Sequence, residues 1–284
     1  MQFTIRVFTV ILFIFAFIYI RLPDQKTVPS AKFIEIEPNE MLVSFLPLKQ
    51  GEATLIQLSD REFYLIDTGS PECTEQLLTM LNQHGVGQLK GLILTNPSDD
   101  HFGGFNQILN QYSIQSIYIP ELISSTFPIP SAYQKKIKKI KAQDEIQINQ
   151  NIKIVVLSPI EPLSLSPQAN SLVFQLIHKD VQILFTSDIN QEIEQRLLER
   201  YPLKSEILKV SDFGGVAGSD ATFLEKVDAQ VGIIFSSDRE LYALSEDVLE
   251  RLNESWMDVM ILEKEGEVQI LSNGTNYSLE RVNY

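Results

Sequence analysis

The stretch Leu92-Ile-Leu-Thr-Asn-Pro-Ser-Asp-Asp-His-Phe-Gly-Gly104 decides how the rest of this chain is interpreted. Its apolar start predicts a buried strand, and the polar residues after it predict a loop that leads into a helix at about His101. Carboxylate and imidazole groups are ligands for divalent metal ions, so Asp100 and His101 are candidate metal ligands. Asn96 and Ser98 offer only an amide and a hydroxyl, which are poor zinc ligands.

The stretch resembles the Thr-His-x-His-x-Asp-His signature of the metallo-β-lactamase fold. In that signature, two His side chains on an extended segment point the same way and hold one metal ion, and the following Asp and His hold a second. Asn96 and Ser98 stand at the positions of the first pair, and Asp100 and His101 at those of the second. The resemblance therefore implies a degenerate metal site, with the second pair kept and the first replaced.

Other segments extend the resemblance from about residue 41 to about residue 255. In order and spacing they are similar to the metallo-β-lactamase-like domain of ComEC-type competence (DNA-uptake) proteins. The matching segments are Val43–Gln57, Leu65–Gly69, Ser171–Leu176 with Ile183–Asp188, Leu208–Gly214 and Leu241–Ser245. The fold class that this implies is α/β (α+β): a four-layer αββα sandwich, with the site at the edge where the loops after the strands meet.

The resemblance also assigns roles to individual residues. Asp67 lies where the family places an Asp that braces the metal loop from behind the ligands, and Asp188 lies at the metal-bridging carboxylate. One ion would be held by Asp100, His101 and Asp188 with water, and Asp212 would be a further oxygen donor. Asp100 is also the residue expected to act in catalysis.

The remaining ligand positions lack His. By the resemblance, the first ion would need His at Asn96, at Ser98 and at Asp212 or Phe213, and the second would need one at Ala243. The sequence therefore predicts either one weakly held divalent ion (zinc, manganese or magnesium) or no metal at all.

If no metal binds, two of the acidic residues have a simpler structural explanation. Asp100 would cap the helix that opens at His101, and Asp188 would cap a helix that starts near Asn190.

Composition restricts the possible partners. The chain has 284 residues, of which 44% are hydrophobic, so one domain with a sizeable core is expected. Its single Cys73 excludes an intrachain disulfide. The net charge of −14 opposes nucleic-acid binding over the whole surface. A basic stripe at 135–141, predicted on a short helix, is the exception; it would contact phosphate or anionic lipid, or form a solvated helix face.

The N-terminus differs from the rest of the chain. Residues 3–20 are mostly apolar and no small-residue cleavage site follows, which predicts an uncleaved transmembrane signal anchor. Residues 21–40 are expected to be a linker and 41–284 the metallo-β-lactamase-like domain. The protein would then be a single-pass protein of the cell membrane, with its domain on the extracytoplasmic side. A buried helix of the domain and a cleaved export signal are the alternatives.

Hydrophobic periodicity predicts strands and helices in an order that suits a layered fold. Strands are expected at 41–46, 53–58, 62–67, 91–95, 115–119, 144–148, 152–157, 171–178, 181–186, 205–210, 230–235, 257–263 and 267–272. Helices are expected at 74–84, 101–111, 190–200, 219–227 and 245–254. Residues 41–272 should therefore form one sandwich.

Two functional hypotheses follow, and they leave open whether the protein is an enzyme. In the first, the domain is an inactive or weakly active descendant that serves as a binding or scaffold module at the membrane, with a protein partner. In the second, it is a metal-dependent phosphodiesterase or nuclease that uses a single ion in DNA uptake or processing.

Overall fold

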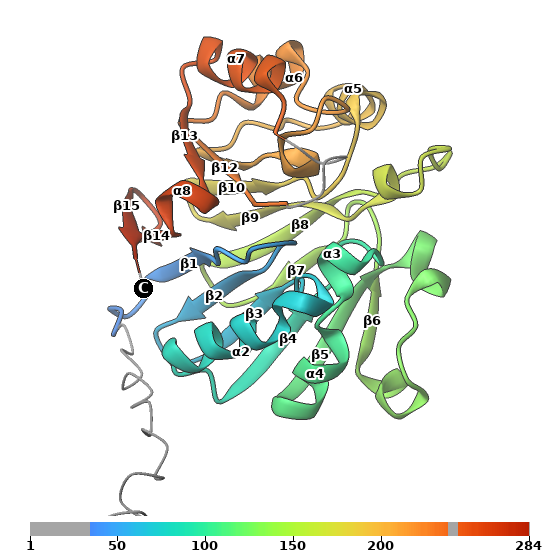
Figure 1. Ribbon diagram of the computed structural model, residues 1–284, viewed down its shortest axis with the longest axis vertical. Coiled ribbons are helices and arrows are strands. Elements are labelled where there is room, and N and C mark those ends of the chain that lie inside the picture. The colour runs from blue at the N-terminus through green and yellow to red at the C-terminus, as the bar shows by residue number, and fades with distance from the viewer. Residues whose placement is uncertain (1–34, 238–243, 284) are drawn as a thin grey trace, which may run out of the picture. The chain divides into compact units, whose positions relative to one another are not determined.

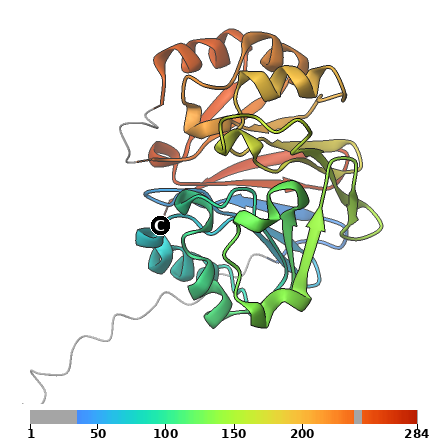
Figure 2. The ribbon, with the colours of Figure 1, turned by 90° about the vertical axis from the view of Figure 1, so that its right-hand side faces the viewer.

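Two β-sheets lie face to face in the computed structural model, which describes residues 35–237 and 244–283. Helices cover the outer face of each sheet, and Figure 2 shows the four layers stacked in order. The predicted αββα sandwich is therefore confirmed.

The larger sheet has eight strands, six from the N-terminal half of the domain and two from its C-terminal end (Figure 1). Its strands, in spatial order, are β15 (Tyr277–Val282), β14 (Glu267–Ser272), β1 (Met41–Phe45), β2 (Thr54–Leu58), β3 (Phe63–Ile66), β4 (Gln88–Ile93), β5 (Ser113–Pro120) and β6 (Ile137–Ile140). Neighbours from β3 to β6 are parallel, and the others are antiparallel.

The smaller sheet has seven strands and repeats this division. Its strands are β13 (Asp258–Ile261), β12 (Val231–Ile234), β11 (Ile207–Lys209), β10 (Val181–Phe185), β9 (Val173–His178), β8 (Ile152–Ser158) and β7 (Glu145–Gln147). Neighbours from β10 to β13 are parallel, and β7 to β10 are antiparallel. Each sheet thus has a parallel block whose carboxyl ends carry loops, the usual place for a site in such sheets.

Helices connect the parallel strands. The α-helices are α2 (Thr74–Gln83), α3 (Asp99–Phe102), α4 (Phe105–Gln111), α5 (Gln191–Leu198), α6 (Ala221–Val227), α7 (Glu246–Glu254) and α8 (Leu262–Glu265). The 3-10 helices are η1 (Pro71–Cys73), η2 (Glu121–Thr126), η3 (Ser131–Lys136), η4 (Gln168–Asn170) and η5 (Ser211–Gly214).

Three apolar clusters hold the layers together. The central cluster lies between the sheets, where the ring centroids of Phe174 and Phe185 are 4.8 Å apart and those of Phe45 and Phe185 are 6.0 Å apart. A second cluster packs α2 and α4 on the larger sheet, and a third packs α5, α6 and α7 on the smaller one. Burial of this apolar surface is the main source of stability, at roughly 25 cal/mol per Å² removed from water.

The basic stripe is helical only at its start, so the prediction that it lies on one short helix was wrong. Residues 131–136 form η3, and 137–140 form β6, which pairs in parallel with β5. Ile137 packs against the second cluster, on the outer face of the larger sheet, and Ile140 is buried between the sheets. Lys138 and Lys139 are exposed. Pairing at the edge of the sheet overrides the local helical pattern.

The helix predicted at 101–111 is two helices, α3 and α4, separated by Gly103 and Gly104. A Cβ at Gly104 would lie 2.5 Å from the carbonyl oxygen of Thr68, and one at Gly103 would lie 2.5 Å from the backbone nitrogen of Pro71. The two glycines therefore allow the loop after β3 to pack directly against the junction of α3 and α4. The sandwich also extends beyond residue 272, because β15 adds an edge strand.

Within 35–237 and 244–283, no helix is long and apolar enough to cross a membrane. The predicted anchor at 3–20 lies outside the described residues, as does most of the predicted linker.

The fold makes a direct prediction at Gly91 in β4. A Cβ there would lie 2.5 Å from Cδ1 of Tyr64 and 3.1 Å from Cε2 of Tyr118. We expect Gly91→Val to lower the free energy of unfolding by about 1–3 kcal/mol through overpacking, as measured by urea denaturation. Gly87→Val is the matched control, because no heavy atom lies within 4 Å of a Cβ at Gly87. If both variants lost the same free energy of unfolding, the close contact of Gly91 with Tyr64 and Tyr118 would be contradicted.

Candidate functional site

Loops from both sheets bring five charged side chains together at the carboxyl ends of the parallel strands. Glu52 comes from the β1–β2 loop, Asp67 follows β3, His101 lies in α3, Asp188 follows β10 and Lys209 ends β11. Each residue is at most 6% exposed. We call this group the buried charge cluster.

His101 lies at the centre of the buried charge cluster. Its Nδ1 is 2.9 Å from Oδ2 of Asp67, and its Nε2 is 3.0 Å from both carboxylate oxygens of Asp188. With a carboxylate at each ring nitrogen, the imidazole can donate at both only in its protonated form. Burial lowers the pKa of His101, but the carboxylates of Asp188, Glu52 and Asp67 outweigh it and raise that pKa well above 6.5.

Lys209 supplies a second buried cation. Its ammonium group contacts Oε1 of Glu52 and donates to the carbonyl oxygen of Ser187 at 3.0 Å. It also lies 5.8 Å from the ring centroid of Phe213 and 5.9 Å from that of Phe235. Burial raises the pKa of Glu52 to about 7, although Lys209 and His101 act to lower it.

Asp67 ties the end of β3 to the end of β4. Its Oδ1 accepts a hydrogen bond from the backbone N–H of Thr95 at 2.8 Å, and its Oδ2 accepts one from the Thr95 hydroxyl at 2.6 Å. The backbone of Asp67 is left-handed, with φ of 57°, an unfavourable conformation that functional sites often contain. Because Asp67 also contacts His101, it lies where the resemblance places the bracing residue.

Asn96 and Ser98 occupy the positions of the missing His pair. The Asn96 amide donates to Oγ of Ser171 at 2.9 Å and to Oδ2 of Asp188 at 3.1 Å. Its own oxygen accepts from the Ser98 N–H at 2.9 Å. Asn96 thus joins the loop after β4 to Asp188 through hydrogen bonds.

Asp100 contacts the β1–β2 loop. Its Oδ1 accepts a hydrogen bond from Nε2 of Gln50 at 3.0 Å, and its backbone oxygen accepts one from the N–H of Glu52 at 2.9 Å. Gly51 packs against this backbone with φ of 87°, and a Cβ there would also lie 2.7 Å from the nitrogen of Ser70. Asp100 therefore positions the loop that carries Glu52.

Asp212 and Phe213 both have left-handed backbones, with φ of 50° and 54°. Phe213 is buried, and its ring centroid lies 6.0 Å from that of His101. An aromatic ring thus fills the space at a position where the resemblance expects a metal-binding His. Asp212 is partly buried, and burial together with the Asp188 charge raises its pKa to about 6.

A buried carboxylate holds the glycine-rich loop that follows Asp212. Glu194 in α5 accepts hydrogen bonds from the N–H groups of Ser219 and Asp220 at 2.6 and 2.9 Å. Arg251 in α7 donates to the carbonyl oxygens of Ser219 and Gly218 at 2.7 and 3.1 Å. Burial raises the pKa of Glu194 to about 7.

The capping roles proposed for the two acidic residues were wrong. Asp100 lies inside α3, whose N-cap is Ser98. The N-cap of α5 is Asn190, whose side chain accepts a hydrogen bond from the N–H of Ile193 at 3.2 Å, while Asp188 contacts His101 instead. Ala243, the fourth predicted position, lies outside the described residues.

The donor atoms can be tested against a metal ion. Ligand atoms of Glu52, Asp67 and His101 lie within 4.8 Å of one another, a spacing that could hold one. In the present arrangement, however, an imidazolium has no lone pair to offer, and Lys209 contacts Glu52. These residues would hold an ion once His101 had lost its proton and Glu52 its contact with Lys209.

The sequence interpretation missed Glu52 and Lys209. The sequence around Lys209 could have revealed it, because Lys209 lies between the apolar residues Leu208 and Val210. A single charged residue among apolar neighbours indicates a buried charge with a partner. The identity of the partner could not be inferred, since Glu52 and Lys209 belong to different sheets.

Comparison with known proteins supports the family. The family described as the metallo-beta-lactamase superfamily matches residues 46–237. ComE operon protein 3 of Bacillus subtilis is 26% identical over 201 residues, which are 68% of this chain and 26% of that protein. Competence protein ComA of Neisseria gonorrhoeae is 24% identical over 220 residues, which are 75% of this chain and 30% of that protein. The chain thus spans less than a third of either relative.

Solved structures share the fold at low identity. The metallo-beta-lactamase fold protein YhfI from Bacillus subtilis has a TM-score of 0.53 at 15% identity, covering 78% of this chain and 96% of that one. Igni18, a metallo hydrolase from Ignicoccus hospitalis, has a TM-score of 0.53 at 11% identity, covering 80% and 98%. Since the family match covers more than half of the chain, this protein belongs to the metallo-β-lactamase superfamily, with a domain of the type found in ComEC-like competence proteins.

Proposed function

We propose that this chain is a membrane-anchored metallo-β-lactamase-fold protein that works as a binding or scaffold module and hydrolyses substrates weakly or not at all. The observation that carries the proposal is the pairing inside the buried charge cluster. His101 lies between Asp67 and Asp188, and Lys209 contacts Glu52. Two protein cations thereby neutralise carboxylates that a metal-dependent member of the fold would direct at metal ions.

The electrostatics of the site support this proposal. A buried carboxylate without a positive partner is costly, whereas a complete set of pairs and hydrogen bonds is tolerated. The cluster holds three carboxylates and two cations, and Asn96 donates a further hydrogen bond to Asp188. This pairing supports a site that does not depend on a metal ion.

The membrane location is part of the same proposal. The apolar segment at 3–20 would cross the membrane once, and the domain would lie on the extracytoplasmic side. A module of this kind would act on a protein partner at the membrane. Its net charge of −14 disfavours nucleic acid as a general ligand.

A second candidate function is a hydrolase of phosphodiesters with one divalent ion, either zinc, manganese or magnesium. The close approach of Glu52, Asp67 and His101 favours it, and Asp100 and Asp212 would be further oxygen donors nearby. The resemblance to competence proteins makes nucleic acid the substrate class to test.

Hydrolysis distinguishes the two functions. We expect the wild type and Asp188→Ala to hydrolyse bis-p-nitrophenyl phosphate and single-stranded DNA at the same background rate with added zinc, manganese or magnesium. The reason is that the carboxylates that would bind a metal ion are already paired with His101 and Lys209. Asp60→Ala, which changes an exposed acid in the β2–β3 turn, is the control. Turnover that requires a metal and disappears only in Asp188→Ala would establish the hydrolase.

The ion pair of Lys209 and Glu52 should matter for stability. Lys209→Met leaves a buried carboxylate without its cation, so we expect the free energy of unfolding to fall by about 3–5 kcal/mol. Adding Glu52→Gln to Lys209→Met should recover part of the loss, because the unpaired charge is then gone. Urea denaturation of the wild type, both single variants and the double variant measures the coupling. Additive losses would show that the two side chains do not act as a pair.

The anchor is tested by truncation. Removing residues 1–22 should move the protein from the membrane fraction to the soluble fraction, because the apolar run at 3–20 is lost. Immunoblots of fractionated cells measure the distribution. Recovery of the full-length protein in the soluble fraction without detergent, or a mature N-terminus that begins after Ile20, would contradict the proposal.

A further inference from the structure

Trp256 is the only tryptophan of the chain, and 93% of it is exposed. It directly follows Ser255, the C-cap of α7, and has a left-handed backbone with φ of 60°. Glycine is the usual residue directly after a helix C-cap, because without a Cβ it adopts the left-handed conformation without steric strain. A bulky aromatic residue is therefore held in an unfavourable conformation without being buried.

The hydrogen bonds around Trp256 do not require an indole. The N–H of Trp256 donates to the carbonyl oxygen of Asn253 at 3.0 Å, and that of Met257 donates to the carbonyl oxygen of Leu252 at 3.3 Å. These are backbone bonds that glycine would make equally well. Neither helix termination nor core packing explains the side chain, and strain of this kind often accompanies function.

Two surface hollows lie along α7 beside Trp256. One, of about 360 Å³, is lined by Trp256 together with residues of α6, among them Leu224. The other, of about 490 Å³, is lined by α7 residues, among them Leu249. Glu254 borders both, so the two hollows are adjacent on this surface. We call this surface the Trp256 face.

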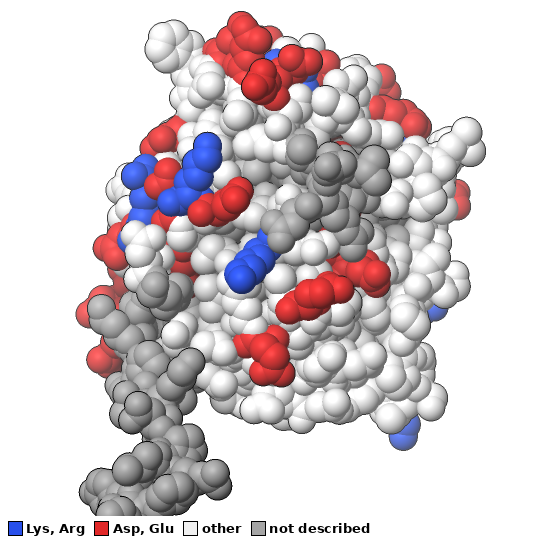
Figure 3. Space-filling view, in the orientation of Figure 1, with Lys and Arg blue, Asp and Glu red and all other residues white. Residues whose placement is uncertain are grey.

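Acidic side chains surround the Trp256 face. Carboxylates line the two hollows, namely Glu225, Asp228, Glu246, Glu250 and Glu254. Figure 3 shows acidic residues gathered at the end of the molecule where Figure 1 places α7. Arg251 also lines the face, but its guanidinium donates to the carbonyl oxygens of Ser219 and Gly218. Asp228 pairs with Lys204 at 2.8 Å, but the carboxylates still outnumber the one guanidinium, so the Trp256 face carries a net negative charge.

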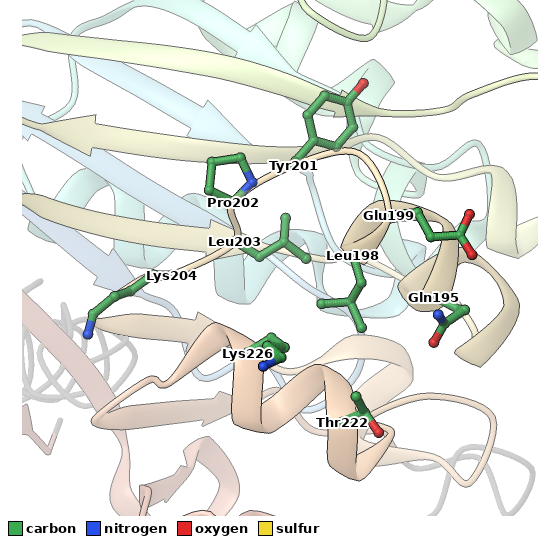
Figure 4. A pocket seen from close by; sticks show the side chains of 9 residues that line it. All are labelled: Gln195, Leu198, Glu199, Tyr201, Pro202, Leu203, Lys204, Thr222 and Lys226. Atoms are coloured by element: carbon green, nitrogen blue, oxygen red, sulfur yellow. The ribbon is translucent and has the colours of Figure 1, made fainter.

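The hollow on the other side of α6 differs in charge. It has about 410 Å³, lies between α5 and α6, and includes Lys204 and Lys226 (Figure 4). Leu198 and Leu203 lie between the two helices, and the Lys204 side chain points away from the other labelled residues. Glu199 also lines this hollow, and Lys204 pairs with Asp228 at 2.8 Å, so it is mixed in charge, whereas the Trp256 face is mainly acidic.

We infer that the Trp256 face docks a cationic segment of a partner protein, in which an arginine or lysine lies over the indole and its neighbours pair with the carboxylates. Tryptophan is the best aromatic partner for a cation, and exposed tryptophan is enriched among residues that dominate binding. The inference rests on the proposed binding role and gives that role its contact surface. It does not involve the buried charge cluster, which lies on other loops.

The single tryptophan makes the test direct. The full-length protein, solubilised in detergent, is titrated with a synthetic decapeptide of alternating Arg and Ser while indole fluorescence is recorded. We expect saturable quenching, and none with a peptide in which Glu replaces Arg. By calorimetry, Trp256→Ala should bind about tenfold more weakly. Trp256→Phe should retain part of the affinity, because an aromatic face remains.

Two controls separate docking from structure and from general attraction. Trp256→Gly relieves the left-handed strain, so its unfolding free energy should not fall although binding is lost. Glu254→Gln should weaken binding, whereas Glu280→Gln, an exposed acid on β15, should not. Unchanged peptide affinity in Trp256→Ala, or equal losses in the two Glu variants, would overturn the inference. So would an indole response to phosphatidylglycerol vesicles with none to the peptide. The Asp188→Ala hydrolysis assay fails or succeeds independently of these results.

Discussion

The placement of one imidazole between two carboxylates underlies the whole site. Asp67 follows a strand of the larger sheet and Asp188 follows a strand of the smaller sheet, so His101 joins the two halves of the sandwich. Its charge compensates carboxylates that would otherwise be unpaired in the interior. Removing one partner from such a buried set is far more costly than never having formed it, and the loops must therefore keep all members in place.

The backbone supplies the precision that this placement needs. Gly51 and Asp67, in loops, and Asp212 and Phe213, in η5, have positive φ and lie next to residues of the buried charge cluster. Such conformations persist only where neighbouring hydrogen bonds and packing hold them. Here the hydrogen bonds from Thr95 hold Asp67, and the hydrogen bonds from Ser219 and Asp220 to Glu194 hold the loop after η5. The loops of a metal-binding fold can thus retain their shape with hydrogen bonds and ion pairs.

The contrast between the two regions of the molecule supports a binding role. At the buried charge cluster, the charged groups are turned inward and satisfied by one another. On the Trp256 face, an indole and several carboxylates are turned outward, and most of that aromatic surface has no contact within the fold. Groups of the first kind stabilise a domain, and groups of the second kind are available to a partner.

The sequence by itself determined the family, the layered sandwich and the approach of Asp67 and Asp188 to His101. These follow from ordered motifs and from the rule that loops after parallel strands meet at one edge. Tertiary structure alone decided that Lys209 pairs with Glu52, that 137–140 form a strand, and that Asp100 supports the β1–β2 loop. Each depends on a partner distant in the chain or on a sheet edge, and local periodicity carries no information about either.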